Sequence, residues 1–422
     1  MRSANNKSAD GKIFSAITIV AALGYFVDIY DLVLFSVERV ASLKTLLGEN
    51  ATQEAIKNTG KFLLNMQMGG MLLGGVVWGV LGDKKGRIAV LFGSILMYSI
   101  ANILNGFITN VPQYAALRLV SGFGLAGELG VGITLVSETL STKSRGYGAT
   151  FVATIGVFGA VVAGFMSDFI SKLNVAESWR YSFFIGGGLG LLLLLMRIGV
   201  YESGMFSALK KQNVMRGNFL YLFKNKNSRN KFLGIVLATV PVWYVMGILI
   251  TFSPELMQHL GADFEADAGK AIAFAFIGIT IGDLASGLLS QYLQSRKKVM
   301  MIFVSFLALC TVVYLQTAYL NEKWFYTICV IIGFATGYWA VFITTASELF
   351  GTNLRATATT SAPNFVRGSV IVLTLLSTLL ESLTGSILFA TAILGVVVLT
   401  AAIYSIYHLP ETFHKDLDYL ET

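Results

Sequence analysis

Long apolar runs alternate with short polar connections along the whole chain. We read twelve runs of roughly 20 residues, six before a polar middle segment and six after it. A helix of about 20 residues spans the ~30 Å hydrocarbon core of a bilayer. The pattern predicts an all-α membrane protein with twelve transmembrane helices in two pseudo-symmetric six-helix bundles. The expected helices cover 13–37, 62–82, 88–109, 114–138, 146–171, 181–200, 231–255, 270–292, 299–319, 324–348, 356–380 and 384–407.

The polar middle segment divides the chain. We expect an N-terminal six-helix bundle over residues 1–200, a cytoplasmic basic linker over 201–230 and a C-terminal six-helix bundle over 231–422. The linker owes its charge to Lys210, Lys211, Arg216, Lys224, Lys226 and Arg229.

Composition supports a membrane protein and suggests its orientation. Hydrophobic residues make up 55% of the 422 positions, charged residues 13%, and the mean hydropathy is +0.69. The net charge of +7 does not indicate nucleic-acid binding, because the basic residues lie in short connections between apolar runs. By the positive-inside rule, the linker and both termini are expected in the cytoplasm, in a plasma membrane or the inner membrane of a bacterium. The connection after the seventh run is acidic and is expected outside; it holds Glu255, Asp263, Glu265 and Asp267.

Sequence features of enzymes are absent. Cys310 and Cys329 lie inside apolar runs, so we expect packing residues rather than a disulfide framework. No P-loop, dinucleotide fingerprint, catalytic triad or metal cluster occurs at usable spacing. We expect no enzymatic activity, cofactor or metal. The expected partners are a small-molecule solute, protons and the lipid bilayer, and a monomer is the expected functional unit.

The two halves repeat each other. Ser-Glu followed by Arg closes the fourth run at Glu138 and Arg145, and the pattern recurs 210 residues later at Glu348 and Arg355. Gly127 likewise matches Gly337. A parallel repeat of six helices is typical of transporters that rock two halves about a midplane site.

A glycine-rich motif follows the second run. Residues 75–87 resemble the GxLxDxxGR signature between helices 2 and 3 of the major facilitator superfamily, which implies a conformational latch between halves. The latch would involve Gly79, Asp83, Gly86 and Arg87, together with the repeated Glu138, Arg145, Glu348 and Arg355. A solvated turn is the alternative. The second half has Gln291 where the motif has Asp, which puts a second latch in doubt.

Other motifs indicate groups within this superfamily. Helix 4 is similar to the RxxxGxG, GGE and ExxPxxxRG patterns of sugar porters, metabolite:proton symporters and phosphate:proton symporters, although Ser141 and Gly351 replace the proline. Residues 24–31 are similar to helix 1 of the phosphate and metabolite symporters. The sugar-porter QQxSG signature is absent after helix 7, which argues against a sugar porter.

Charged residues inside the apolar runs are the candidate coupling groups. Charges within a membrane helix are costly and usually face an aqueous path or a partner. Counting about 1.5 Å per residue brings Asp31 and Arg118 to similar depths, and places Asp28, Glu128, Asp283 and Arg367 near the midplane. We expect Asp28, Asp31, Arg118 and Glu128 to couple transport to protons. The alternative for Asp31 and Arg118 is a permanent ion pair.

Arg367 is the candidate anion anchor, because its planar guanidinium suits a carboxylate or phosphate. It resembles, in position and in the following Gly368, a helix 11 lysine-glycine of phosphate symporters, and we expect it to contact the solute or Asp283. Further candidate binding residues are Asn364, Trp243, Tyr244, Tyr338, Trp339 and Gln67, for each of which simple packing is the alternative.

These features favour a proton-coupled symporter of a small organic anion, such as a carboxylate metabolite. Inorganic phosphate is the nearest alternative. An uncoupled facilitator or exporter of neutral or cationic solutes is a second class, supported by the excess of midplane acid over base.

Overall fold

The computed structural model describes residues 15–48, 50–141, 144–173, 176–198, 217–415 and 419–420. Within these residues it contains twelve helical spans that are long and apolar enough to cross a membrane, as predicted. The N-terminal spans are α1 (Ala16–Leu47), α2 (Gln53–Lys85), α3 (Arg87–Asn105), α4 (Val111–Leu125) with α5 (Glu128–Thr139), α6 (Arg145–Lys172) and α7 (Trp179–Met196).

The C-terminal spans follow a short helix, α9 (Tyr221–Lys224). The seventh span joins α10 (Lys226–Leu237), α11 (Val240–Tyr244), the π-helix η1 (Val245–Ile250) and α12 (Ser253–His259). The others are α13 (Ala268–Tyr292), α14 (Arg296–Tyr314), α15 (Glu322–Thr336) with α16 (Trp339–Leu349), α17 (Arg355–Thr384) and α18 (Ile387–His408), with the 3-10 turn η2 (Thr317–Tyr319) after α14. The expected linker residues Lys210, Lys211 and Arg216 and the N-terminal tail lie outside the described residues, and α10 already begins at Lys226.

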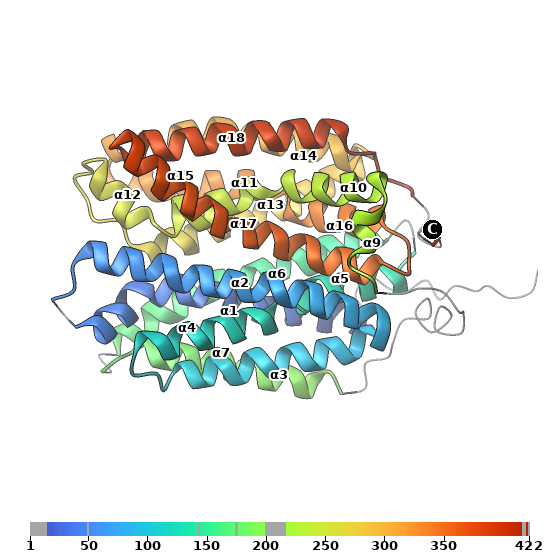
Figure 1. Cartoon of the computed structure of the whole chain (residues 1–422), viewed down its shortest axis with the longest axis horizontal. Helices are drawn as coiled ribbons and strands as arrows, with labels where there is room; N and C mark the ends of the chain where they lie inside the picture. Colours follow the sequence, from blue (N-terminus) through green and yellow to red (C-terminus); the bar gives the residue numbers. More distant parts are fainter. Residues whose placement is uncertain are drawn as a thin grey trace, which may run out of the picture.

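The two bundles lie side by side with their helices roughly parallel (Figure 1). Helices α1–α7 form the lower bundle in this view and α9–α18 the upper one, and α17 packs along α2 between them. We call the right-hand end, with the α2–α3, α5–α6, α13–α14 and α16–α17 connections, the basic end. The opposite end, with the α1–α2 and α12–α13 connections, is the acidic end.

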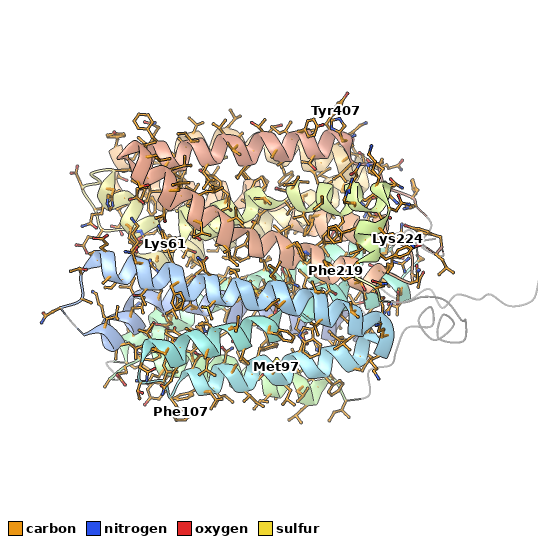
Figure 2. All side chains as sticks on the ribbon, in the orientation of Figure 1. Lys61, Met97, Phe107, Phe219, Lys224 and Tyr407 are labelled. Atoms are coloured by element: carbon orange, nitrogen blue, oxygen red, sulfur yellow. The ribbon has the colours of Figure 1, made fainter. Side chains whose placement is uncertain are left out.

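Apolar side chains cover the outside of the bundles. Phe107 and Tyr407 project from the surface in Figure 2, with 66% and 69% of their area exposed. Apolar exposure on this scale is unfavourable in water but suits a surface that contacts lipid chains.

Helices α1 and α2 extend beyond their apolar runs at the acidic end. α1 continues to Leu47 and α2 starts at Gln53, about ten residues further than expected at each end. The side chain of Thr52 accepts a hydrogen bond from the Ala55 backbone nitrogen and so caps α2. An apolar run marks only the part of a helix that lies in hydrocarbon, and capped polar turns can continue it into the interface.

The fourth and tenth spans are both interrupted at the matched glycines. A Cβ atom on Gly127 would lie 2.6 Å from Cβ of Ser94, and one on Gly337 would lie 2.5 Å from Cα of Gly282. These close crossings require glycine. Each interruption starts a new helix, α5 or α16, whose first residues lie deep inside the protein.

Candidate functional site

A buried ion pair joins the two bundles near the centre of the molecule. Arg367 Nη2 of α17 lies 3.8 Å from Asp28 Oδ2 of α1, and their side chains are 1% and 0% exposed. Neither carboxylate oxygen of Asp28 forms a hydrogen bond with a described residue, and the same holds for all three guanidinium nitrogens of Arg367. Buried charges are normally saturated with hydrogen bonds, so this loose pair has unused binding capacity on both sides.

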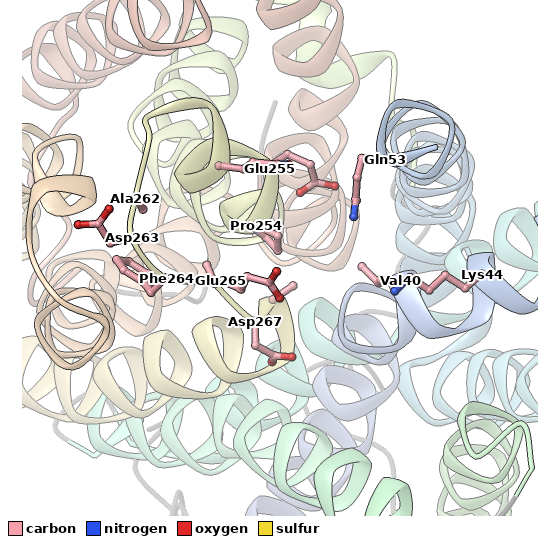
Figure 3. Close-up of a pocket in the computed structure, with 13 residues that line it drawn as sticks. Val40, Lys44, Gln53, Pro254, Glu255, Ala262, Asp263, Phe264, Glu265 and Asp267 are labelled. Atoms are coloured by element: carbon pink, nitrogen blue, oxygen red, sulfur yellow. The ribbon is translucent and has the colours of Figure 1, made fainter. Parts of the chain in front are cut away.

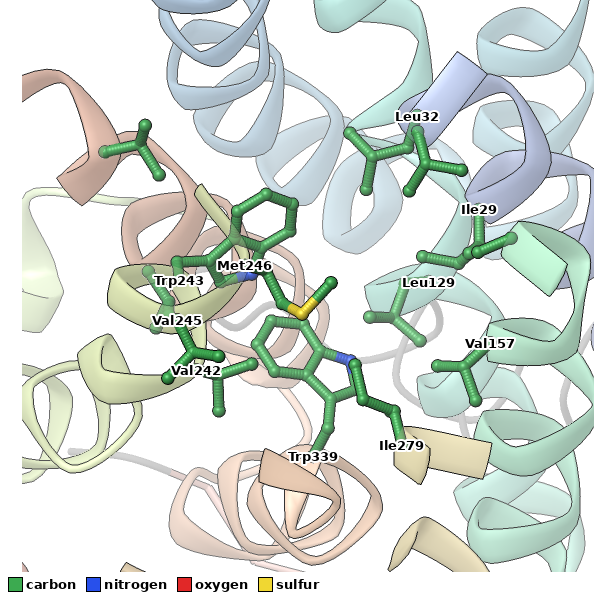
Figure 4. Close-up of a cluster of buried hydrophobic side chains, with 14 of the residues drawn as sticks. Ile29, Leu32, Leu129, Val157, Val242, Trp243, Val245, Met246, Ile279 and Trp339 are labelled. Carbon is green, nitrogen blue, oxygen red and sulfur yellow. The ribbon is translucent and has the colours of Figure 1, made fainter. Parts of the chain in front are cut away.

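Aromatic and aliphatic side chains surround the ion pair. Trp339 Nε1 donates to the Tyr25 hydroxyl at 2.9 Å across the bundle interface, and the Arg367 guanidinium lies 5.7 Å from the centre of the Trp339 ring. Figure 4 shows Met246 between Trp243 and Trp339, with Ile29 and Val157 on the opposite side. The small cavity here is lined by Tyr25, Ile29, Val157, Val242, Trp243, Met246, Phe276, Ile279, Trp339 and Arg367.

This cavity is small in the present conformation. It leaves about 20 Å³ for the centre of a water molecule, which is room for about one water. A solute of several carbon atoms would require the two bundles to separate at one end.

Arg367 is not paired with Asp283, which was the alternative to a contact with the solute. Asp283 Oδ1 accepts a hydrogen bond from the Ala340 backbone nitrogen at 3.0 Å, so this carboxylate lies at the N-terminus of α16. A helix N-terminus carries unpaired N–H groups and a partial positive charge, both of which stabilise a carboxylate. The break at Gly337 creates this N-terminus. The sequence repeat identified Gly337 as a matched position, but it did not indicate that Asp283 binds the helix that begins after it.

Asp31 and Arg118 are neighbours without a hydrogen bond between them. Arg118 acts electrostatically on Asp31, but its Nη2 donates to Asn102 Oδ1 at 2.9 Å, and its guanidinium lies 4.9 Å from the centre of the Phe183 ring. Neither Asp31 oxygen has a hydrogen-bond partner in the described part of the chain. The tight permanent ion pair considered as an alternative is therefore not formed here.

Glu128 has a tight partner that sequence reasoning missed. Arg197, just after α7, donates to both Glu128 oxygens at 2.9 and 2.6 Å, and Ser94 donates to Oε1 at 2.9 Å. Both charged side chains are at most 2% exposed. Arg197 is a charged residue near the end of an apolar run. That position was the feature of the sequence that could have indicated a buried partner for Glu128.

Only three of the expected binding residues line the cavity: Arg367, Trp243 and Trp339. The hydroxyls of Tyr244 and Tyr338 donate to the Thr391 and Ala238 carbonyls. Two expected residues bind backbone carbonyls elsewhere: Asn364 donates to Ala126 and Thr360, and Gln67 donates to Leu32. In the present conformation these four side chains bind backbone carbonyls and do not line the cavity, and their role in solute binding stays a prediction.

The expected latch residues meet at the basic end in a nearly two-fold arrangement. Glu138 accepts from Arg87 of its own bundle at 2.9 Å and from Arg355 of the other bundle at 3.3 Å. Glu348 accepts from Arg296 of its own bundle at 3.3 Å and from Arg145 of the other at 3.1 Å. Arg296 was not among the expected residues.

Asp83 makes this arrangement asymmetric. It accepts from the backbone nitrogens of Ala356 and Thr357 at the start of α17, at 3.2 and 2.8 Å, and forms an ion pair with Arg87 at 3.3 Å. Gly79 packs against the Thr357 backbone, and Gly86 has a φ of +114° at the turn. The corresponding Gln291 packs against Gly146 of α6, where its Nε2 has no described hydrogen-bond partner, in accordance with the doubt about a second latch.

A buried ion pair also joins the two bundles at the acidic end. Arg39 of α1 donates to both oxygens of Glu255 in α12, at 2.7 and 3.2 Å, and to the Thr251 carbonyl at 3.2 Å. Both side chains are at most 5% exposed. The sequence did not indicate that Arg39 and Glu255 form a pair, because Arg39 lies beyond the first apolar run.

We expect Glu255→Gln to loosen this end, because it removes a buried charge partner of Arg39. A Met246→Cys probe in a background lacking Cys310 and Cys329 should react several-fold faster with a water-soluble maleimide in detergent. The matched control is Glu381→Gln, since Glu381 forms a half-buried ion pair with Lys57 at 3.1 Å. Equal reaction rates for both variants would contradict a sealing role for Arg39 and Glu255.

Comparison with known proteins agrees with this architecture. The sequence model of the Major Facilitator Superfamily matches residues 21–375. The chain is 26% identical to a probable 4-methylmuconolactone transporter of Cupriavidus pinatubonensis, over 92% of this chain and 89% of that one. It is 24% identical to a benzoate transport protein of Acinetobacter baylyi, over 69% and 67%. The fold resembles the proton:xylose symporter XylE from E. coli, with a TM-score of 0.74 and 19% identity over 96% and 97% of the two chains. Twelve helices in two bundles, interrupted at matched glycines and joined by repeated Glu–Arg contacts, together with this match over most of the sequence, establish that the chain belongs to the Major Facilitator Superfamily.

Proposed function

We propose that the protein is a secondary transporter that carries a small organic anion together with a proton by alternating access. The observation that carries this proposal is the Asp28–Arg367 pair, which spans the two bundles at 3.8 Å and receives no hydrogen bond from any described residue. We also propose that the basic end faces the cytoplasm, by the positive-inside rule.

The pair suggests how proton and solute are coupled. While Asp28 is ionised it competes with a solute anion for Arg367. When Asp28 binds a proton, Arg367 becomes an uncompensated buried cation and its affinity for a carboxylate rises. Proton and anion therefore favour each other's binding, and together they leave the net charge of the site unchanged.

The cavity wall favours an apolar, ring-bearing monocarboxylate over inorganic phosphate. Trp243, Trp339, Tyr25 and Phe276 offer flat surfaces, while Arg367 is the one cation among the cavity-lining residues. Phosphate would need several further donors to replace its hydration shell. The names of the relatives, which refer to 4-methylmuconolactone and benzoate, point in the same direction.

The geometry weakens the alternative of a cationic solute. That alternative rested on an excess of acids near the midplane. Arg197 neutralises Glu128, Arg367 neutralises Asp28, and Asp283 lies at a helix N-terminus. Two of the three central carboxylates are thus paired with arginines, and Asp283 is the one that has only backbone donors among the described residues.

Uptake into proteoliposomes tests the proposed function. We expect accumulation of benzoate or a similar aromatic acid under an inward proton gradient, and only equilibration without one. Phosphate and betaine should not accumulate under either condition. Equal accumulation with and without the proton gradient would reject coupling, and accumulation of betaine alone would reject the anion site.

A further inference from the structure

A group of exposed cations lies where the seventh span begins, at the basic end. We call residues 217–229, which contain α9 and the first turn of α10, the basic corner. Lys224, Lys226 and Arg229 are exposed there, and none of them forms an ion pair with a residue that the structure describes. The sequence has no Asp or Glu from 203 to 254. Exposed cations with no acid nearby in the sequence attract anions from the surroundings.

Two of these cations continue the lipid-facing stripe of α10. Leu233 and Leu237 are 40% and 45% exposed, within a span that crosses the membrane. Arg229 precedes Leu233 by one helical turn, and Lys226 precedes Arg229 by three residues, so all four side chains share one face of the helix. A lipid molecule beside the leucines would therefore have its phosphate group at the depth of the two cations.

Helix α9 extends this surface sideways. Leu220 is 75% exposed, and the Lys224 ammonium lies 5.4 Å from the centre of the Tyr221 ring, at the basic end of the molecule (Figure 2). Asn225 ends α9 and caps α10 by accepting a hydrogen bond from the backbone two residues further on, so Lys224 and Lys226 lie on either side of a bend. An exposed leucine beside tyrosine and lysine is typical of a membrane–water interface.

Aromatic packing holds the basic corner against α17. The rings of Phe219 and Phe232 lie 5.7 and 5.4 Å from the ring of Phe365, and Phe232 is fully buried. The cations are therefore presented on a segment that is already in place, which lowers the entropy cost of binding a ligand. Phe365 is two residues before Arg367, so the basic corner packs on the helix that contributes to the solute site.

Cations of the acidic end have acids beside them. Figure 3 shows Lys44 of α1 facing Glu265 and Asp267 across the pocket that these residues line. Lys57 forms an ion pair with Glu381 at 3.1 Å. Neighbouring carboxylates oppose the attraction of such a cation for an external phosphate. The charges of the basic corner lack this opposition, which favours an anionic ligand there.

We propose that the basic corner binds the headgroup of an anionic phospholipid. Lys224, Lys226 and Arg229 bind the phosphate, while Leu220 and Leu233 contact the acyl chains. A guanidinium donates two parallel hydrogen bonds to phosphate oxygens, and ammonium groups add charge. The site is separate from the solute cavity and does not depend on which solute is transported.

Lipid titration of the purified full-length protein in detergent tests this site. We expect phosphatidylglycerol to raise the melting temperature, because a ligand of the folded state stabilises it. Phosphatidylcholine with the same acyl chains should bind at least about tenfold more weakly, because it has no net negative charge. Combining Lys224→Gln, Lys226→Gln and Arg229→Gln should weaken phosphatidylglycerol binding at least about tenfold, because each base near the membrane surface adds to the attraction. Without lipid, this triple variant should melt like the wild type, since the three side chains are exposed.

The matched control removes three exposed cations of the acidic end by combining Lys44→Gln, Lys270→Gln and Lys323→Gln. This variant should bind phosphatidylglycerol like the wild type. Wild-type affinity in the basic-corner variant would overturn the proposal, and so would equal weakening in both triple variants, because total charge would then control binding. Glycerol phosphate, which lacks acyl chains, should stabilise the protein far less than phosphatidylglycerol does. Equal stabilisation by glycerol phosphate would overturn the lipid site and assign the basic corner to a soluble anion.

Discussion

Asp28→Asn is expected to abolish accumulation against a gradient while preserving exchange. An inward gradient of one pH unit supplies about 1.4 kcal/mol per proton and supports about tenfold accumulation of an anion carried with one proton. The amide cannot carry that proton, so the accumulation ratio of the variant should be close to 1. Uptake and counterflow in the same proteoliposomes measure both properties.

The pH dependence of solute binding provides an independent measurement. In the wild type, affinity should fall as the pH rises, because ionised Asp28 competes with the solute anion for Arg367. In Asp28→Asn the competitor is absent at every pH, so affinity for the anion should be high and nearly constant. A variant that still accumulates solute, or a wild type whose affinity rises with pH, would contradict the coupling scheme.

Hydropathy could predict the fold because the bilayer imposes a length on each apolar run. All twelve spans were therefore predictable. The predicted helix ends were wrong mainly at α1 and α2, where capped turns extend beyond the hydrocarbon. The π-helical segment after Tyr244 was not predictable, because no single residue type specifies i→i+5 hydrogen bonding.

The candidate site was only partly predictable, because residue counting gives depth but not direction. It placed Asp28, Asp283 and Arg367 in one layer, yet could not tell that α17 faces α1 at this depth. The residues that meet at the basic end were easier to predict, because the repeated Glu–Arg spacing identifies equivalent positions in the two bundles. Arg39 and Arg197 were missed because each lies near the end of an apolar run, where charges were interpreted as membrane boundaries.

Arg197 carries the largest expected effect on stability. Among the described residues, Arg197→Met leaves Glu128 as a buried carboxylate whose side-chain donor is Ser94. Glu128→Gln leaves a buried guanidinium without its anionic partner, with the Leu91 carbonyl and the new amide oxygen as acceptors. Breaking a buried pair by removing one partner costs about 3–5 kcal/mol. Each single variant should therefore lose about that much unfolding free energy in a denaturant titration in detergent. The matched control is Asp168→Asn, which removes a largely exposed ion pair with Lys172 and should change stability by less than about 1 kcal/mol.

The double variant decides what Glu128 does. Two neutral side chains of similar length remove both unpaired charges, so Glu128→Gln with Arg197→Met should recover most of the lost stability. If Glu128 only holds α5 to the segment after α7, the double variant should also accumulate solute under a proton gradient. A stable double variant that exchanges solute but cannot accumulate it would instead restore Glu128 to the proton-coupling role expected from the sequence. We expect accumulation to persist, because a carboxylate bound at both oxygens by one guanidinium gains little by exchanging that partner for a proton.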